Sequence, residues 1–157
     1  MISETEKNKI KEAVDEFLEK MTITASKIEV VLPQPGGEFD VANVEIKLEE
    51  PQILIGQGGQ TLFEIQRLLK MVLNKKLQKV FYLSLDINDY KKKKIEYLQD
   101  LAKDLADEVA LTKKEKEFSP MPAYERRAIH AALSKRTDII AESQGEEPNR
   151  RIVIKPR

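Results

Sequence analysis

Cysteine is absent from the 157 residues, and histidine occurs once, as His130. Without cysteine there can be no disulfide, thiol nucleophile or thiolate zinc site, and a single histidine cannot build a multi-histidine metal site. The longest unbroken hydrophobic run is Val80–Leu83, too short to cross a membrane or to form the apolar core of a signal peptide. We therefore expect a cytoplasmic protein without a transmembrane segment, and nothing in the sequence suggests a metal or cofactor.

The sequence also lacks net charge, since 27 Lys and Arg balance 27 Asp and Glu. Charged residues make up 34% of the chain, more than the usual quarter, which favours two small domains with a large surface. The charge is unevenly placed. Residues 1–53 carry a net charge of −6, residues 54–79 carry +4 and residues 121–157 carry +3. The balance excludes a uniformly basic nucleic-acid sleeve and leaves two local basic zones.

Apolar spacing in the first half predicts an αββααβ order. An amphipathic helix is expected after a capping box formed by Ser3 and Glu6. The return strand changes phase near Ala42, which suggests a β-bulge there. Pro51 is expected to start a short helix. The expected elements are a helix at 4–21, strands at 26–32 and 39–48 around a turn at 33–37, a helix at 60–76 that buries Leu62, Ile65, Leu68, Leu69 and Val72, and a strand at 80–87 with Phe81, Leu83, Leu85 and Ile87 on one face.

The second half is expected to begin with a long helix at 89–111, for which Asn88 and Asp89 offer an N-cap. Lysines at 91–94 oppose the helix dipole, so we expect them to be solvated or paired with acidic groups. A helix from Pro122 to about Arg136 follows, and then strands at 137–142 and 150–155 around a turn at Gln144 and Gly145. We predict an α+β fold with domains at 1–88 and 89–157, the second a small α/β domain led by the long helix.

Four residues between the two central helices form a glycine loop, Gly56-Gln57-Gly58-Gly59. Glycines let the backbone approach a ligand, and the amides of the following helix suit a phosphate. No Lys-Ser/Thr pair follows, as a Walker loop requires, and no strand precedes the loop, as a dinucleotide fingerprint requires. A plain joint between two helices remains the alternative.

In its αββααβ context, the loop at 56–59 resembles that of a type II KH domain, covering residues 1–88. Such domains clamp about four nucleotides of a single strand. KH loops often carry Lys or Arg where this sequence has Gln57 and Gly58, so binding would rest on backbone amides and on cations further along the helix. The resemblance implies nucleic-acid contacts at Gly56, Gln57, Gly58, Gly59, Arg67 and Lys70.

The second basic zone contains Arg126 and His130, which share one helix face at i, i+4. Together they could donate to one phosphate, although a structural histidine is the alternative. The segment resembles the small single-strand-binding domain named for its Arg-x-x-x-His spacing, through Glu125, the turn at 144–148 and the last strand. The resemblance implies binding by Arg126 and His130. Charge and position add Arg127, Arg150 and Arg151.

A catalytic interpretation is weak. Ser134 and Asp138 follow His130 at helical spacing, but no nucleophile elbow surrounds the serine. We therefore expect a non-enzymatic protein with no catalytic residue.

The order of the two domains resembles the bacterial Jag family, also called SpoIIIJ-associated or KhpB proteins. Its members usually carry a further N-terminal domain, which we expect to be absent here. The resemblance implies a single-stranded RNA-binding, post-transcriptional regulator linked to cell elongation and division, with a small single-KH protein as partner. Single-stranded DNA is an alternative ligand, and a homodimer is an alternative to a monomer. The alternative is a protein-interaction adaptor in which only the C-terminal domain binds nucleic acid.

Overall fold

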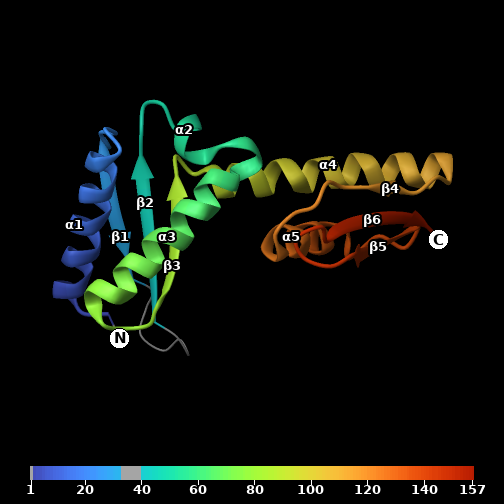
Figure 1. Ribbon diagram of the computed structural model, residues 1–157. Coiled ribbons are helices and arrows are strands. Elements are labelled where there is room, and N and C mark those ends of the chain that lie inside the picture. The colour runs from blue at the N-terminus through green and yellow to red at the C-terminus, as the bar shows by residue number, and fades with distance from the viewer. Residues whose placement is uncertain (1, 33–39) are drawn as a thin grey trace. The chain divides into compact units, whose positions relative to one another are not determined.

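The computed structural model describes residues 2–32 and 40–157. The chain divides into two compact units, Met1–Lys91 and Lys92–Arg157, and Figure 1 shows the elements of each. The turn expected at 33–37 and the predicted strand residue Phe39 lie outside the described residues. Mixed helices and small sheets give the chain an α+β fold, as the sequence predicts.

The N-terminal unit has the predicted αββααβ order. Its three-stranded sheet has the order β1-β2-β3, with β1 antiparallel and β3 parallel to β2. Helices α1 and α3 contact each other and pack on the outer strands (Figure 1). The elements are α1 (Glu4–Lys20), β1 (Lys27–Val31), β2 (Val41–Lys47), α2 (Gln52–Ile55), a short 3-10 turn η1 (Gln57–Gly59), α3 (Gln60–Leu77) and β3 (Tyr82–Ile87).

The start of α1 follows from its sequence. The Ser3 hydroxyl accepts from the Glu6 amide at 3.2 Å, and the Glu6 carboxylate accepts from the Ser3 amide at 2.7 Å. This reciprocal pair satisfies two amides that the first helical turn cannot bond internally. The predicted capping box is confirmed.

Strand β3 is as predicted, whereas β2 differs. Phe81, Leu83, Leu85 and Ile87 are all buried, as expected for alternation on one face. Along β2 the registers with both neighbours run residue for residue, so the bulge predicted near Ala42 is wrong. Ala42 is itself a core residue with Val44 and Ile46. The strand therefore alternates regularly, with Ala42 on the buried face and Val41 on the other. The alternation was misread because Val41 is more apolar than Ala42.

The buried face of α3 is narrower than predicted. Leu62, Ile65 and Leu69 are buried as expected, but Leu68 and Val72 are 47% and 45% exposed. Leu73, which the pattern did not select, is fully buried. Apolar side chains lie on both sides of this helix, so periodicity alone could not distinguish the buried side.

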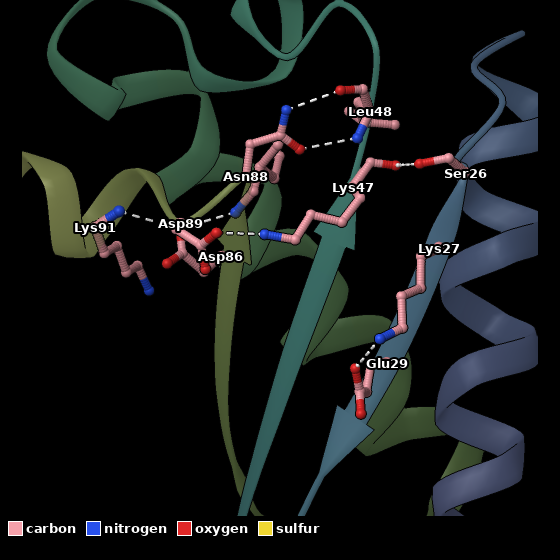
Figure 2. A network of polar contacts seen from close by, with 10 residues as sticks. Ser26, Lys27, Glu29, Lys47, Leu48, Asp86, Asn88, Asp89 and Lys91 are labelled. Carbon is pink, nitrogen blue, oxygen red and sulfur yellow. Dashed lines mark hydrogen bonds and ion pairs between the residues drawn. The ribbon is translucent and has the colours of Figure 1, made fainter.

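The turn between β3 and α4 (Tyr90–Thr112) contains Asn88 and Asp89, the two residues predicted to offer an N-cap. Asn88 and Asp89 both have positive φ, at 51° and 57°. The Asn88 carboxamide accepts from the Leu48 amide at 2.9 Å and donates to the Leu48 carbonyl at 2.8 Å, as Figure 2 shows. The Asp89 carboxylate pairs with the Lys47 ammonium. Both side chains therefore bind the end of β2.

Asp86 supplies an acceptor at the first turn of α4. Its carboxylate accepts from the backbone amide of Lys91 at 3.1 Å and from that of Ile87 at 2.8 Å (Figure 2). The left-handed turn at 88–89 permits this, because it folds the chain back toward the end of β3.

The C-terminal unit packs the rest of α4 and α5 against a small antiparallel sheet of order β4-β6-β5. Strand β4 was not predicted, and α5 ends at Leu133 rather than near Arg136. Arg136 instead binds the carboxylates of Asp107 and Asp138. The remaining elements are β4 (Lys116–Glu117), α5 (Ala123–Leu133), β5 (Ile139–Gln144) and β6 (Arg151–Pro156).

Apolar spacing along α4 predicts a buried stripe at Ile95, Leu98, Leu101, Ala102, Leu105 and Val109. Leu98, Ala102 and Val109 are buried, whereas Ile95, Leu101 and Leu105 are only half-buried. Ala106 joins the buried residues, and the pattern missed it because alanine gives a weak apolar signal. Across the two described stretches, no helix has both the length and the hydropathy that a membrane span requires.

Candidate nucleic-acid interface

The glycine loop has a backbone that few other residues could adopt. Gly56 ends α2 with φ 71° and ψ −177°, a region essentially restricted to glycine. Gly59 precedes α3 with φ 86°. A Cβ on Gly56 would lie 2.0 Å from the Thr61 hydroxyl oxygen, and one on Gly59 would lie 2.7 Å from the Tyr90 ring. Both conformation and close packing therefore require glycine at these two positions.

The middle of the loop is open. A Cβ on Gly58 would meet nothing within 4 Å, although its φ of 61° is also positive. Gln57 is exposed, and among the residues that the structure describes no side chain caps the α3 end of the loop. Because a helix N-terminus directs amide donors and partial positive charge outward, this end can hold an anion without a cationic side chain in the loop.

The two cations expected to assist the loop lie further along α3. Arg67 is exposed and Lys70 is half-buried. The Lys70 ammonium lies 4.9 Å from the centroid of the Tyr82 ring, within the range of a cation–π contact. Arg67 thus projects into solvent, whereas Lys70 rests against β3.

Two residues near the loop were missed by the sequence analysis. Tyr90 packs against the core of the N-terminal unit and approaches Gly59 closely. Its neighbour Lys91 donates to the Gln66 side-chain oxygen at 2.8 Å. The sequence could not indicate these contacts, because each joins residues that are 25 or more positions apart in the chain.

In the C-terminal unit, Arg126 is buried, with 7% of its surface exposed. Its guanidinium donates to the Met121 carbonyl and, at 2.6 Å, to the Glu147 carboxylate. Glu147 lies in the connection between β5 and β6 and is itself exposed. Arg126 therefore ties the start of α5 to this connection. The sequence predicted a phosphate contact at Arg126, and its geometry is that of an internal ion pair.

The other predicted residues of this unit are more accessible. Arg127 and Arg150 are exposed, and His130 and Arg151 are half-buried. The Arg150 guanidinium donates to the Ser143 hydroxyl at 2.8 Å, and that of Arg151 to the Glu117 carboxylate at 2.9 Å. The hydroxyl that binds Arg150 is neutral, so this contact leaves the positive charge of Arg150 uncompensated. The charge of Arg151 is balanced by the Glu117 carboxylate.

Glu125, adjacent to Arg126, is only 1% exposed. Its carboxylate pairs with the Lys94 ammonium at 2.8 Å and accepts from the Tyr124 hydroxyl at 3.0 Å. This pair joins α5 to α4 and gives one of the lysines at 91–94 the acidic partner that the sequence predicted.

The arrangement does not resemble a hydrolytic site. The Ser134 hydroxyl donates to the Ala131 carbonyl at 2.9 Å, and the Asp138 carboxylate is bound by Arg136. Within residues 2–32 and 40–157, no group of three or more His, Asp or Glu side chains could hold a metal ion. Exposed arginines and an open glycine loop suit electrostatic contact with phosphates.

Comparison with known proteins shows which domain family and which proteins this chain is similar to. Residues 96–156 match the R-three-H domain, the domain of the Arg-x-x-x-His spacing, and this match lies within the C-terminal unit. Over 112 residues the chain is 41% identical to the RNA-binding protein KhpB of Clostridium symbiosum. The chain is thus similar to proteins described as RNA-binding protein KhpB. The predicted Arg-x-x-x-His domain and the predicted resemblance to the Jag family are confirmed.

Two further relatives have the same description. The RNA-binding protein KhpB of Bacillus subtilis is 39% identical over 108 residues, and that of Streptococcus pneumoniae is 33% identical over 112 residues. The matches cover 68% and 71% of this chain, and the Clostridium symbiosum match also covers 71%. They cover 50%, 52% and 34% of the proteins from Clostridium, Bacillus and Streptococcus, so the chain spans about half or less of these relatives.

Proposed function

We propose that this chain is a non-enzymatic protein that binds single-stranded RNA through two surfaces. The observation that carries the proposal is the R-three-H match at residues 96–156, in a chain whose relatives are described as RNA-binding proteins. The first surface belongs to a KH-like domain at 1–88, and the second to the R-three-H domain, for which we propose the bounds 89–157.

The KH-like surface consists of Gly56, Gln57, Gly58 and Gly59 with Arg67 and Lys70. Its loop backbone supplies amide donors, and its cations stand on α3, outside the loop. Helix termini and backbone amides bind phosphate oxygens well but read no base directly. We therefore propose that this surface holds the sugar-phosphate chain weakly.

The R-three-H surface consists of Arg127, His130, Arg150 and Arg151, positioned in part by Arg126. Two linked weak sites gain affinity because binding at one raises the effective concentration of RNA at the other. The whole chain can therefore bind RNA more tightly than either surface alone.

The first experiment is a titration of the full chain with mixed-sequence single-stranded RNA across a range of salt concentrations. Log affinity should fall with log salt with a slope of about −0.7 for each phosphate neutralised. About four to six contacts would give a slope near −3 to −4. A flat salt response would contradict the proposal, because phosphate contacts release counterions.

A loop variant tests the first surface. Gln57→Asp places a negative charge where phosphate would lie, whereas Gln57→Asn keeps the position neutral. Gln57 is exposed, so circular dichroism and the melting temperature should be unchanged in both. Weaker RNA binding by Gln57→Asp alone would support the loop as a contact surface, and equal binding by both would exclude it.

A second candidate is a protein-interaction adaptor in which only the R-three-H domain binds nucleic acid. It is favoured by the absence of a basic side chain within the loop at 56–59. In that case Gln57→Asp would leave RNA affinity intact.

Through the family resemblance we further propose a post-transcriptional role in bacterial elongation and division, with a small single-KH protein as partner. Co-purification with that protein tests this role.

A further inference from the structure

The Lys91 ammonium occupies an unusual position in the N-terminal unit. It is half-buried and donates to the Gln66 side-chain oxygen at 2.8 Å and to the Ser84 hydroxyl at 3.5 Å. Burial lowers the pKa of this amine, and the charge of Asp86 opposes that effect. Within the part of the chain that the structure describes, no ion pair joins the Lys91 ammonium to a carboxylate.

These contacts contribute little to the fold. The Gln66 oxygen already accepts from the backbone amide of Leu85 at 2.9 Å, so it keeps a partner without Lys91. The Ser84 contact lies beyond the usual range of a strong hydrogen bond. Asp86 is occupied by two backbone amides. A partly desolvated charge without a close counter-ion is unfavourable in a folded protein, which suggests a purpose outside the fold.

The position of this ammonium relates it to the glycine loop. Tyr90, the preceding residue, lies directly against Gly59. Gln66, which holds the amine, follows Gly59 by seven residues on α3, or about 10 Å along the helix axis. Figure 2 shows the Lys91 side chain pointing away from the Asn88–Leu48 pair. A strand of about four nucleotides, the length that a KH domain clamps, can extend over that distance.

We propose that Lys91 is a nucleic-acid-binding residue whose ammonium contacts a backbone phosphate next to the one held by the glycine loop. An ammonium has three N–H donors. Gln66 takes one and Ser84 makes only a long contact with a second, so at least one donor remains for a phosphate oxygen. Lys91 thereby supplies the cation that Gln57 and Gly58 do not. The inference rests on the proposed RNA binding of the N-terminal unit.

The test compares two neighbouring lysines in the full chain. Lys91→Met removes the proposed contact, and Lys92→Met removes an exposed charge one position further along α4. Affinity for mixed-sequence single-stranded RNA is measured across a salt series. Lys91→Met should weaken binding about tenfold and make the salt slope shallower by about 0.7, the value for one phosphate. Lys92→Met should leave the slope unchanged.

A second measurement avoids any effect of substitution on folding. The unmodified protein is treated with an amine-acetylating reagent with and without RNA, and each lysine is followed by mass spectrometry. RNA should slow the modification of Lys91 relative to that of Lys92. Equal rates for Lys91 with and without RNA would overturn the proposal.

The outcomes separate the two proposals. If Gln57→Asp weakens binding and Lys91→Met retains the wild-type affinity and salt slope, Lys91 is not a ligand and the proposed RNA binding stands. If the wild-type protein shows no salt-dependent RNA binding, the proposed function is wrong and this inference with it.

Discussion

The two surfaces proposed to bind phosphate differ in the source of their positive charge. At the glycine loop the side chains are neutral, and the backbone is shaped by two glycines that packing makes obligatory. Around α5 the cations are abundant, but Arg126 and Arg151 are bound to Glu147 and Glu117. The comparison teaches that a count of basic residues overstates the positive charge that a surface can offer, because ion pairs neutralise part of it.

The largest effect is expected at Gly56. Gly56→Ala should lower the free energy of unfolding of the N-terminal unit by about 3 kcal/mol, combining the unfavourable backbone region with a steric clash at Thr61. Gly58→Ala is the matched control, because it shares positive φ but meets open space, and it should cost about 1 kcal/mol. Chemical denaturation measures both. Equal costs would show that close packing does not fix the loop.

A smaller loss of stability is expected at Arg126. Arg126→Ala should destabilise the C-terminal unit by about 2 kcal/mol, because charge-assisted hydrogen bonds to Met121 and Glu147 are lost. Arg127→Ala, its exposed neighbour, should change stability by less than about 0.5 kcal/mol. Thermal melting compares the variants, and hydrogen exchange of residues 144–150 should quicken only for Arg126→Ala. An unchanged exchange rate would show that Arg126 does not hold this connection.

The share of affinity in each surface can then be compared. We expect the R-three-H surface to contribute more, because its exposed arginines outnumber those beside the loop. Arg127→Ala with Arg150→Ala should weaken RNA binding about tenfold, or about 1.4 kcal/mol, and more than Gln57→Asp does. The comparison uses full-length proteins at one ionic strength. A larger loss for Gln57→Asp would reverse the ranking.

The smallest effect concerns acid stability of the C-terminal unit. Hydrogen bonds from Arg136 lower the pKa of Asp138 to about 2 from an ordinary 3.8. A lowered pKa means that Asp138 stabilises the fold above about pH 4 and that this contribution is lost as the pH falls toward 2. Melting temperatures between pH 6 and 2 should therefore fall less steeply for Asp138→Asn than for wild type. Asp104→Asn, an exposed carboxylate of α4, should retain the wild-type slope.

Much of the fold could be predicted from local patterns. The capping box at Ser3 and Glu6 and the alternation from Phe81 to Ile87 depend on residues close in the chain, where spacing decides which groups meet. The phase of β2 could not be predicted, because Ala42 resembles a surface residue until a neighbouring strand covers it. The prediction of which side of α3 is buried was partly wrong for a related reason, because apolar residues lie on both sides of this helix.

The candidate site, too, has features that local sequence predicts and features that depend on distant residues. The sequence by itself determined the glycine loop, the two basic zones and the Arg-x-x-x-His spacing, because residue type and order are enough to recognise them. Only the tertiary structure decided which cations are available. Arg126 is paired with Glu147, 21 residues away, and Lys91 is hydrogen-bonded to Gln66, 25 residues away. Ion pairing and burial depend on groups brought together by folding, and no local pattern records them.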